Sequence, residues 1–384
     1  MTTSTHASPA LHIDGIIDDP ATRIIVCCGS GGVGKTTTAA SLGLRAAERG
    51  RQVCVLTIDP ARRLAQSLGL AELDNVPREI PTIDTSAGGR LFAMMLDMKR
   101  TFDEIVEQHA DPQRAEQIMD NPLYQALSSS FAGTQEYMAM EKLGQLHRES
   151  EENGSWDLII VDTPPSRSAL DFLDAPARLG TFLDGRFIRL LTAPARAGGR
   201  AYMRVVGAAI GTVTGALNKI LGAQLLTDLQ TLVAGMDSIF GGFRERAEST
   251  YSLLAAPGTS FLVVAAPERD ALREASYFVE RLQDDQMPLT GLVLNRVHEP
   301  STNELSPDRA AGAAEALDHL GGHDLTSALL RMHADQMRTV ARERRLLERF
   351  SGAHPTVAVA TAPALPGDVH DLAGLRAVGA SLAR

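Results

Sequence analysis

The stretch Arg23-Ile-Ile-Val-Cys-Cys-Gly-Ser-Gly-Gly-Val-Gly-Lys-Thr-Thr37 decides the fold of this chain. Its apolar, β-branched part up to Cys28 is typical of a strand that is buried on both faces. Gly29 to Thr36 matches the pattern G-x-x-x-x-G-K-[ST], whose glycines let backbone N–H groups turn toward phosphate oxygens. The alanine- and leucine-rich residues up to Arg49, followed by Gly50, predict a helix directly after this loop. A strand, a loop and a helix in this order predict a nucleotide-binding site.

Every residue of this loop is a predicted nucleotide contact. Lys35 is expected to reach the β- and γ-phosphates and to take part in catalysis, and the Thr36 hydroxyl to bind the Mg²⁺ that bridges these phosphates. ATP and Mg²⁺ are therefore the predicted cofactors. A glycine-rich turn without a ligand is the alternative, which the flanking strand and helix disfavour. The predicted contacts are Gly29, Ser30, Gly31, Gly32, Val33, Gly34, Lys35, Thr36 and Thr37.

Strands and helices alternate outward from this loop. The run from Gln52 to Ile58 predicts a second strand, and the resulting βαβ crossover implies a parallel sheet. Further strands are predicted at residues 91–96, 158–161, 260–265, 289–294 and 356–360. We therefore predict an α/β fold: a doubly wound, mostly parallel sheet of the P-loop NTPase type with an inserted helical subdomain. The predicted boundaries are a polar extension at 1–22 and an ATPase domain at 23–384, with helical insertions at about 98–150 and 177–254.

Two aspartates follow predicted strands directly. Asp162 comes after Leu158-Ile-Ile-Val161 and is expected to hold the Mg²⁺ shell through a water molecule, beside the phosphate loop. Asp59 comes after Val55-Leu-Thr-Ile58, where a carboxylate can orient or deprotonate an attacking water and lie close to the metal. The alternative for each is an aspartate that merely caps the next helix. Thr36, Asp162 and Asp59 are thus the predicted metal group.

Composition limits the partners and the compartment. With 44% apolar and 22% charged residues the chain resembles ordinary soluble globular proteins. Its formal net charge of −10 makes nucleic acid an unexpected partner, because phosphate backbones bind positive surfaces. The three cysteines, Cys27, Cys28 and Cys54, lie in predicted strands, which indicates buried thiols rather than disulfides. The polar start from Met1 to Pro20 lacks a signal-peptide pattern, so we expect a cytoplasmic protein, with peripheral membrane contact as a second option.

Three motifs resemble one known family. The loop from Gly29 to Thr37, Thr57-Ile-Asp-Pro-Ala61 and Val161-Asp-Thr-Pro-Pro165 resemble the deviant Walker A loop, switch I and switch II of the ArsA/Get3 family of ATPases. Gly133-Thr-Gln-Glu-Tyr-Met138 and Asp171-Phe-Leu-Asp-Ala-Pro176 are similar to its bacterial branch of anion-transporting ATPases. The resemblance implies a dimeric SIMIBI-type ATPase whose nucleotide state opens and closes a composite helical surface. Members drive an arsenite pump or deliver tail-anchored membrane proteins.

The resemblance also implies where the adenine lies. Its contacts correspond to Asn295 in Val293-Leu-Asn-Arg296, and more loosely to Thr361-Ala-Pro363 after the last predicted strand. Asn295 has a rationale of its own, because a side-chain amide offers both a donor and an acceptor to the adenine edge.

The chain departs from the family pattern in three places. Ser30 stands where the family's loop has a signature lysine that reaches the nucleotide of the facing subunit. No Cys-x-x-Cys pair is present, so no structural zinc is expected, and arsenite transport is disfavoured because soft As(III) needs thiolates. Switch I carries Arg62 and Arg63, which are either phosphate contacts or exposed charges. The missing lysine suggests a heteromer with a paralogous ATPase that retains it; the alternative is a homodimer in which Arg62 or Arg167 supplies the charge.

A predicted helix in the second insertion carries an apolar stripe. It is interpreted either as a groove for a hydrophobic client helix or as the permanent core of the subdomain, and a membrane span is disfavoured by its glycines and threonines. The stripe consists of Val206, Ile210, Val213, Leu217, Leu221 and Leu225. The leading functional prediction is an ATPase that couples Mg-ATP hydrolysis to conformational change of a helical partner-binding surface, in membrane-protein targeting or transport. The alternative is a regulatory nucleotide-binding subunit with little turnover.

Overall fold

The computed structural model describes residues 8–59, 63–122, 124–125, 128, 134–164, 242, 245–300, 302 and 304–383. Within these ranges the chain divides into two compact units. The first comprises residues 1–95, 149–169 and 254–384, and the second residues 96–148 and 170–253. Most of the predicted insertion at 177–254, including the apolar stripe from Val206 to Leu225, lies outside the described residues.

An eight-stranded sheet forms the centre of the first unit, in the order β3-β4-β2-β5-β1-β6-β7-β8. Every pairing is parallel except that of β3 with β4, which confirms the predicted mostly parallel α/β fold. The strands are β1 (Ile24–Cys28), β2 (Gln52–Thr57), β3 (Arg78–Glu79), β4 (Arg90–Met95), β5 (Leu158–Asp162), β6 (Thr259–Ala265), β7 (Leu289–Val297) and β8 (Val359–Pro363). The first strand, β1, is central, and all five of its residues are buried. The loop that follows β1 therefore begins in the middle of the sheet edge.

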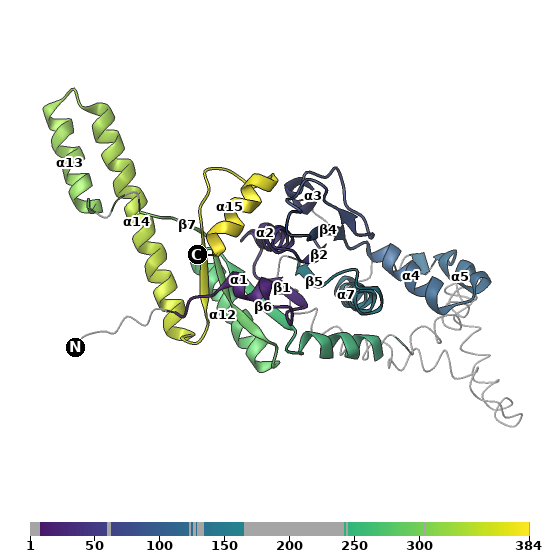
Figure 1. Cartoon of the computed structure of the whole chain (residues 1–384). Coiled ribbons are helices and arrows are strands. Elements are labelled where there is room, and N and C mark those ends of the chain that lie inside the picture. Colours follow the sequence, from purple (N-terminus) through teal and green to yellow (C-terminus); the bar gives the residue numbers. More distant parts are fainter. Residues whose placement is uncertain are drawn as a thin grey trace, which may run out of the picture. The chain divides into compact units, whose positions relative to one another are not determined.

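Helices cover the sheet, and the first unit also carries a helical hairpin. On one face α1 (Ile13–Asp18), α2 (Lys35–Glu48) and α15 (Leu372–Leu382) share a hydrophobic core with the sheet, whereas α12 (Arg269–Asp284) packs against β6 and β7. The hairpin consists of α13 (Pro307–Leu320) and α14 (Asp324–Ala353) and extends away from the sheet (Figure 1). The short α3 (Arg63–Ser67) follows β2.

The described part of the second unit is helical. It contains α4 (Met98–His109), α5 (Pro112–Met119) and most of α7 (Thr134–Asn153). Asp97 and Asp111 cap the first two helices by accepting backbone N–H groups. Within this unit the Arg246 guanidinium pairs with the buried Glu141 carboxylate at 2.9 Å. Among the residues that the structure describes, no helix combines the length and the apolar character needed to cross a membrane.

Three features differ from the sequence expectations. The last strand was predicted at 356–360 but runs from Val359 to Pro363, because the chain still turns at Val357, whose N–H donates to the His354 carbonyl. Within the predicted polar extension, residues 9–11 pair with β8, and the helix α1 that follows buries Ile13 and Ile17. The charged run from Arg342 to Arg345 is typical of a solvated helix over residues 328–350, but this helix buries Val340, Glu343 and Phe350. In the second and third cases a contact with a distant segment overrides the local pattern.

The cysteine prediction is confirmed. Cys27, Cys28 and Cys54 are free thiols buried in β1 and β2. Burial raises the pKa of Cys28 to about 12, so this thiol stays protonated and unreactive.

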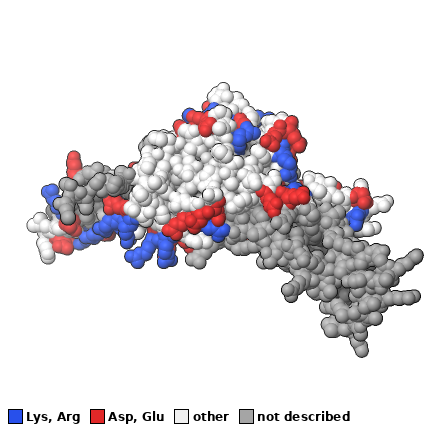
Figure 2. All heavy atoms as spheres, turned by 90° about the horizontal axis from the view of Figure 1, so that it is seen from below, with Lys and Arg blue, Asp and Glu red and all other residues white. Residues whose placement is uncertain are grey.

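On the face seen in Figure 2, acidic and basic side chains lie close to one another, and a broad area between such groups carries neither charge.

Candidate functional site

The loop from Gly29 to Gly34 joins β1 to α2 and depends on two glycines for its path. Gly29 has φ +148°, and a Cβ there would lie 2.1 Å from the Val264 carbonyl oxygen. Gly34 has φ +96°, and a Cβ there would lie 2.1 Å from Asn295 Nδ2. Helix α2 begins at the next residue with no side chain capping it, so its first N–H groups are available to an anion. This is the local geometry that the phosphate-loop prediction requires.

Lys35 is buried at the base of this loop. Its Nζ donates to the Ser30 carbonyl oxygen at 2.9 Å, which folds the side chain back over the loop. Burial lowers the pKa of Lys35, and the nearby Asp162 carboxylate opposes that shift. A phosphate oxygen would offer the ammonium a stronger, charge-assisted partner than the carbonyl does.

A hydrogen-bonded group joins the ends of three elements beside Lys35. The parallel register of β2 and β5 sets Thr57 level with Asp162. Both Thr36 Oγ1 and Thr57 Oγ1 donate to Asp162 Oδ2, at 2.7 and 2.8 Å. Thr57 Oγ1 in turn accepts the Asp59 N–H at 3.2 Å, and Asp59 is half-buried at the end of β2. The structure thus brings Thr36, Asp162 and Asp59 together, as the sequence predicted.

Asp162 suits a cation. Its Oδ1 is buried and has no hydrogen-bond partner among the described residues. Burial raises the pKa of Asp162 to about 6, and the hydrogen bonds from Thr36 and Thr57 oppose the shift. Hydroxyl and carboxylate oxygens are the ligand type that Mg²⁺ prefers, so this pair fits the ion that the phosphate loop implies.

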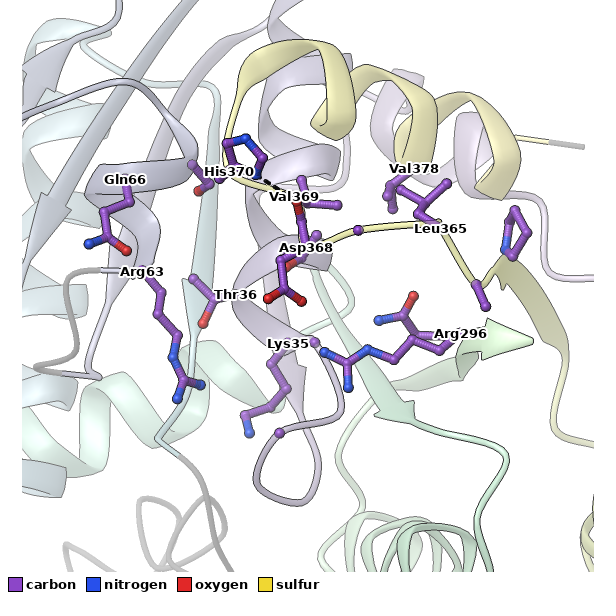
Figure 3. A pocket seen from close by; sticks show the side chains of 18 of the residues that line it. Lys35, Thr36, Arg63, Gln66, Arg296, Leu365, Asp368, Val369, His370 and Val378 are labelled. Carbon is purple, nitrogen blue, oxygen red and sulfur yellow. Dashed lines mark hydrogen bonds between the residues drawn. The ribbon is translucent and has the colours of Figure 1, made fainter. Parts of the chain in front are cut away.

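A cavity of about 1130 Å³ opens over the loop, large enough for a nucleotide. The predicted residues that line it are Gly32, Gly34, Lys35, Thr36, Thr37, Asp59, Asn295 and Pro363. Gly29, Ser30, Gly31, Val33 and Asp162 are not in its wall, and Asp162 is linked to it through Thr36. In the view of Figure 3, Lys35 and Thr36 lie between Arg63 and Arg296.

Asn295 fastens the end of β7 to the phosphate loop. Its Nδ2 donates to the Val33 carbonyl oxygen at 2.9 Å, and its side chain is buried. The Asn295 amide nitrogen is therefore already hydrogen-bonded within the protein. The assignment of Asn295 and Pro363 as adenine contacts stays a prediction.

Several residues of the cavity wall were not predicted from the sequence. Arg296, His298, Gln66, Asp368 and His370 all line it. Arg296 directly follows Asn295 and could have been noted for that reason, whereas the loop after β8 has no recognisable pattern. Arg63 also lines the wall, as one reading of switch I expected, but Arg62 and Arg167 lie outside the described residues.

Comparisons with known proteins agree with this geometry. A family model with the description "Anion-transporting ATPase" matches residues 22–316. "ATPase GET3" of Malassezia globosa is 30% identical over 178 residues, which cover 46% of this chain and 49% of that protein. "ATPase GET3" of Podospora anserina is 26% identical over 298 residues, 74% of this chain and 76% of that protein. "Putative arsenical pump-driving ATPase 1" of Aquifex aeolicus is 25% identical over 259 residues, 66% and 58% of the two chains.

Proposed function

Because the chain belongs to the anion-transporting ATPase family, we propose that this ATPase couples the binding and hydrolysis of Mg-ATP to conformational change of a helical partner-binding surface. The activity serves membrane-protein targeting or transport, in the cytoplasm or at the membrane periphery. One observation carries the proposal: Thr36 and Thr57 both donate hydrogen bonds to Asp162, and Lys35, Thr36 and Asp59 line one cavity.

The residues divide the work of phosphoryl transfer. Lys35 and the first N–H groups of α2 hold the phosphate oxygens, and Thr36 with Asp162 would hold Mg²⁺. When bound there, Mg²⁺ would supply positive charge that neutralises the β- and γ-phosphates. Asp59 stands on the β2 side of Thr36, where its carboxylate orients a water and accepts its proton.

Chain connectivity supports the coupling. Asp162 ends β5, and the second unit begins again at Leu170, only a short segment later. Asp59 follows the end of β2 at Thr57, and α3, whose Arg63 and Gln66 line the cavity, begins four residues after it. A change in ligands at the two carboxylates is therefore passed directly to segments that leave the sheet.

Ser30 favours a second candidate, a regulatory nucleotide-binding subunit with little turnover of its own. Its side chain cannot supply the charge that the family's lysine supplies in trans, and cations supplied in this way are worth about 10³–10⁵ in rate in related NTPases. In a homodimer both sites would lack that charge. We therefore propose a heteromer with a paralogous ATPase whose lysine completes this chain's site.

Turnover of the purified full-length chain with Mg-ATP tests both candidates. Lys35→Ala should weaken ATP binding by about a hundredfold, because it removes charge-assisted hydrogen bonds to the phosphates. Slow turnover that rises with a candidate paralogue, or with Ser30→Lys in a homodimer, supports the heteromer. Fast turnover of the chain alone, which Ser30→Lys does not improve, would eliminate it; failure to bind ATP at all would overturn the proposed function.

A further inference from the structure

A buried carboxylate on the hairpin contacts the wall of the nucleotide cavity. Glu343 belongs to α14 and is 5% exposed, on a helix whose neighbouring charged side chains face solvent. Its Oε2 accepts the His298 backbone N–H at 2.9 Å, and its Oε1 is hydrogen-bonded to His298 Nδ1 at 2.7 Å. Both carboxylate oxygens of Glu343 are thus hydrogen-bonded to His298, which lines the cavity.

The segment that Glu343 holds leads away from Asn295, the β7 residue whose side chain contacts the phosphate loop. β7 is the second strand from β1 and β8 the third, so their ends lie about 10 and 14 Å from the strand that carries the loop. Pairing of Val297 with Pro363 brings the loop after β8 beside His298. With phosphates at β1 and the water-activating carboxylate at β2, the base and ribose are left to the β7 and β8 end.

Arg296 shows that this segment is held in a defined conformation. It has φ +61°, which an arginine adopts only when its surroundings impose it. Two further side chains of α14 bind the same connection: Gln336 Nε2 donates to the Glu299 carbonyl oxygen at 3.1 Å, and His333 Nε2 is hydrogen-bonded to the Leu305 carbonyl oxygen at 2.8 Å. The chain from the cavity wall to α13 is therefore attached to α14 at three points.

We propose that Glu343 is a positioning residue for the nucleotide: it fixes the backbone after β7 so that Arg296 and His298 close the base and ribose end of the cavity. This rests on the proposed function. A buried carboxylate that lost His298 would be left without its partners, which is unfavourable, so α14 and the cavity wall move together. Contact of ATP with this wall is thereby linked to the α13–α14 hairpin.

Glu343→Ala in the full-length chain tests the proposal with two probes, ATP and linear tripolyphosphate, each titrated with Mg²⁺ in a calorimeter. Tripolyphosphate fills the phosphate end but has no base or ribose. We expect ATP affinity to fall about tenfold, as for the loss of hydrogen bonds to a charged group, and tripolyphosphate affinity to stay within about twofold. Glu348→Ala, an exposed carboxylate on the same helix, is the matched control and should change neither.

Two more variants keep the test decisive if Glu343→Ala unfolds the chain. Glu343→Gln retains an oxygen for the His298 N–H and should recover most of the ATP affinity. His298→Ala leaves the backbone bond to Glu343 intact but removes a wall residue, and should weaken ATP alone. Equal losses for both probes, or no loss for either, would overturn the positioning role. A wild-type chain that binds tripolyphosphate but not ATP would overturn it too, whereas a chain that binds neither contradicts the proposed function itself.

Discussion

The two ends of the nucleotide cavity are built in different ways. The phosphate end consists of one contiguous loop, Gly29 to Thr37, and of residues at the ends of the two neighbouring strands β5 and β2. The end that we propose for the base combines the ends of β7 and β8 with a side chain of α14 that lies 45 positions beyond its partner. Phosphate chemistry is therefore encoded locally, whereas the base end exists only once distant segments have packed.

The two ends of the cavity also differ in the burial of their charged groups. At the phosphate end Lys35 and Asp162 are buried, and burial shifts the pKa of each toward its neutral form. At the base end Arg296, Asp368 and His370 are exposed to solvent. Charges in a dry site interact more strongly than charges in water, so substitutions should have large effects at the first end and small ones at the second.

The largest effect is expected from Asp59→Asn. Hydrolysis should fall by about 10²–10⁴, because the amide cannot accept the proton of the attacking water. ATP binding should stay within about threefold, since Lys35 and α2 still hold the phosphates. Single-turnover kinetics beside equilibrium ATP titration separate the two quantities. Normal turnover would show that Asp59 has no role in activating water.

A change in stability is expected from Asp162→Asn. Burial raises the pKa of Asp162 to about 6, so the protonated form favours folding; this contribution is complete below pH 3.8 and is lost as the pH rises through about 6. At pH 7.5 without Mg²⁺ the ionised group thus costs the native state about 3 kcal/mol. Asp162→Asn should raise the free energy of unfolding by about 1–3 kcal/mol at pH 7.5 and by about a third of that amount near pH 4.5.

Urea denaturation at the two pH values measures this difference. Asp14→Asn is the control of opposite sign, because hydrogen bonding to Arg45 lowers the pKa of Asp14 and its ionised form stabilises the fold. That variant should lose stability at pH 7.5. An Asp162→Asn chain that is less stable than the wild type at pH 7.5 would contradict the buried, unpartnered state of its carboxylate oxygen.

A smaller difference, between two glycine variants, is expected where the two ends of the cavity meet. Gly34→Ala places a methyl group on the Asn295 amide, while Gly32→Ala meets no atom within 4 Å, although both glycines have positive φ. Both variants should lose about 1 kcal/mol to backbone strain. Gly34→Ala should lose about 1–2 kcal/mol more, because the Asn295 hydrogen bond to Val33 is displaced. Equal unfolding free energies and equal ATP affinities for the two variants would show that Asn295 does not join the ends.

Sequence reasoning succeeded where the determinants are local. The motif from Gly29 to Thr36, its flanking strand and helix, and the aspartates after β2 and β5 are visible as short patterns, and their strands are apolar runs of the expected length. Parallel pairing then places the ends of β1, β2 and β5 at one edge, which is why Thr36, Asp162 and Asp59 were predicted together.

Sequence reasoning failed where a contact spans most of the chain. Glu343 stands among arginines and resembles an exposed helical residue; only its contact with His298 reveals that it is buried. The two-residue β3 is too short to leave a pattern. Ile13 and Ile17 appear in a polar segment, and their burial depends on packing in a core shared with distant residues of α2 and α15.

The central position of β1 also determines when this strand can pair with its neighbours during synthesis of the chain. Cys27 pairs with Asp162 on one side and with Leu262 on the other, so the strand that carries the phosphate loop emerges early from the ribosome but gains its second neighbour late. At about 5–20 residues per second, synthesis of the chain from β1 to β6 takes roughly ten seconds or more. Throughout it, an apolar strand has an unpaired edge that can template aggregation. A nascent chain of this protein therefore needs protection of this strand until β6 has left the ribosome and paired with it.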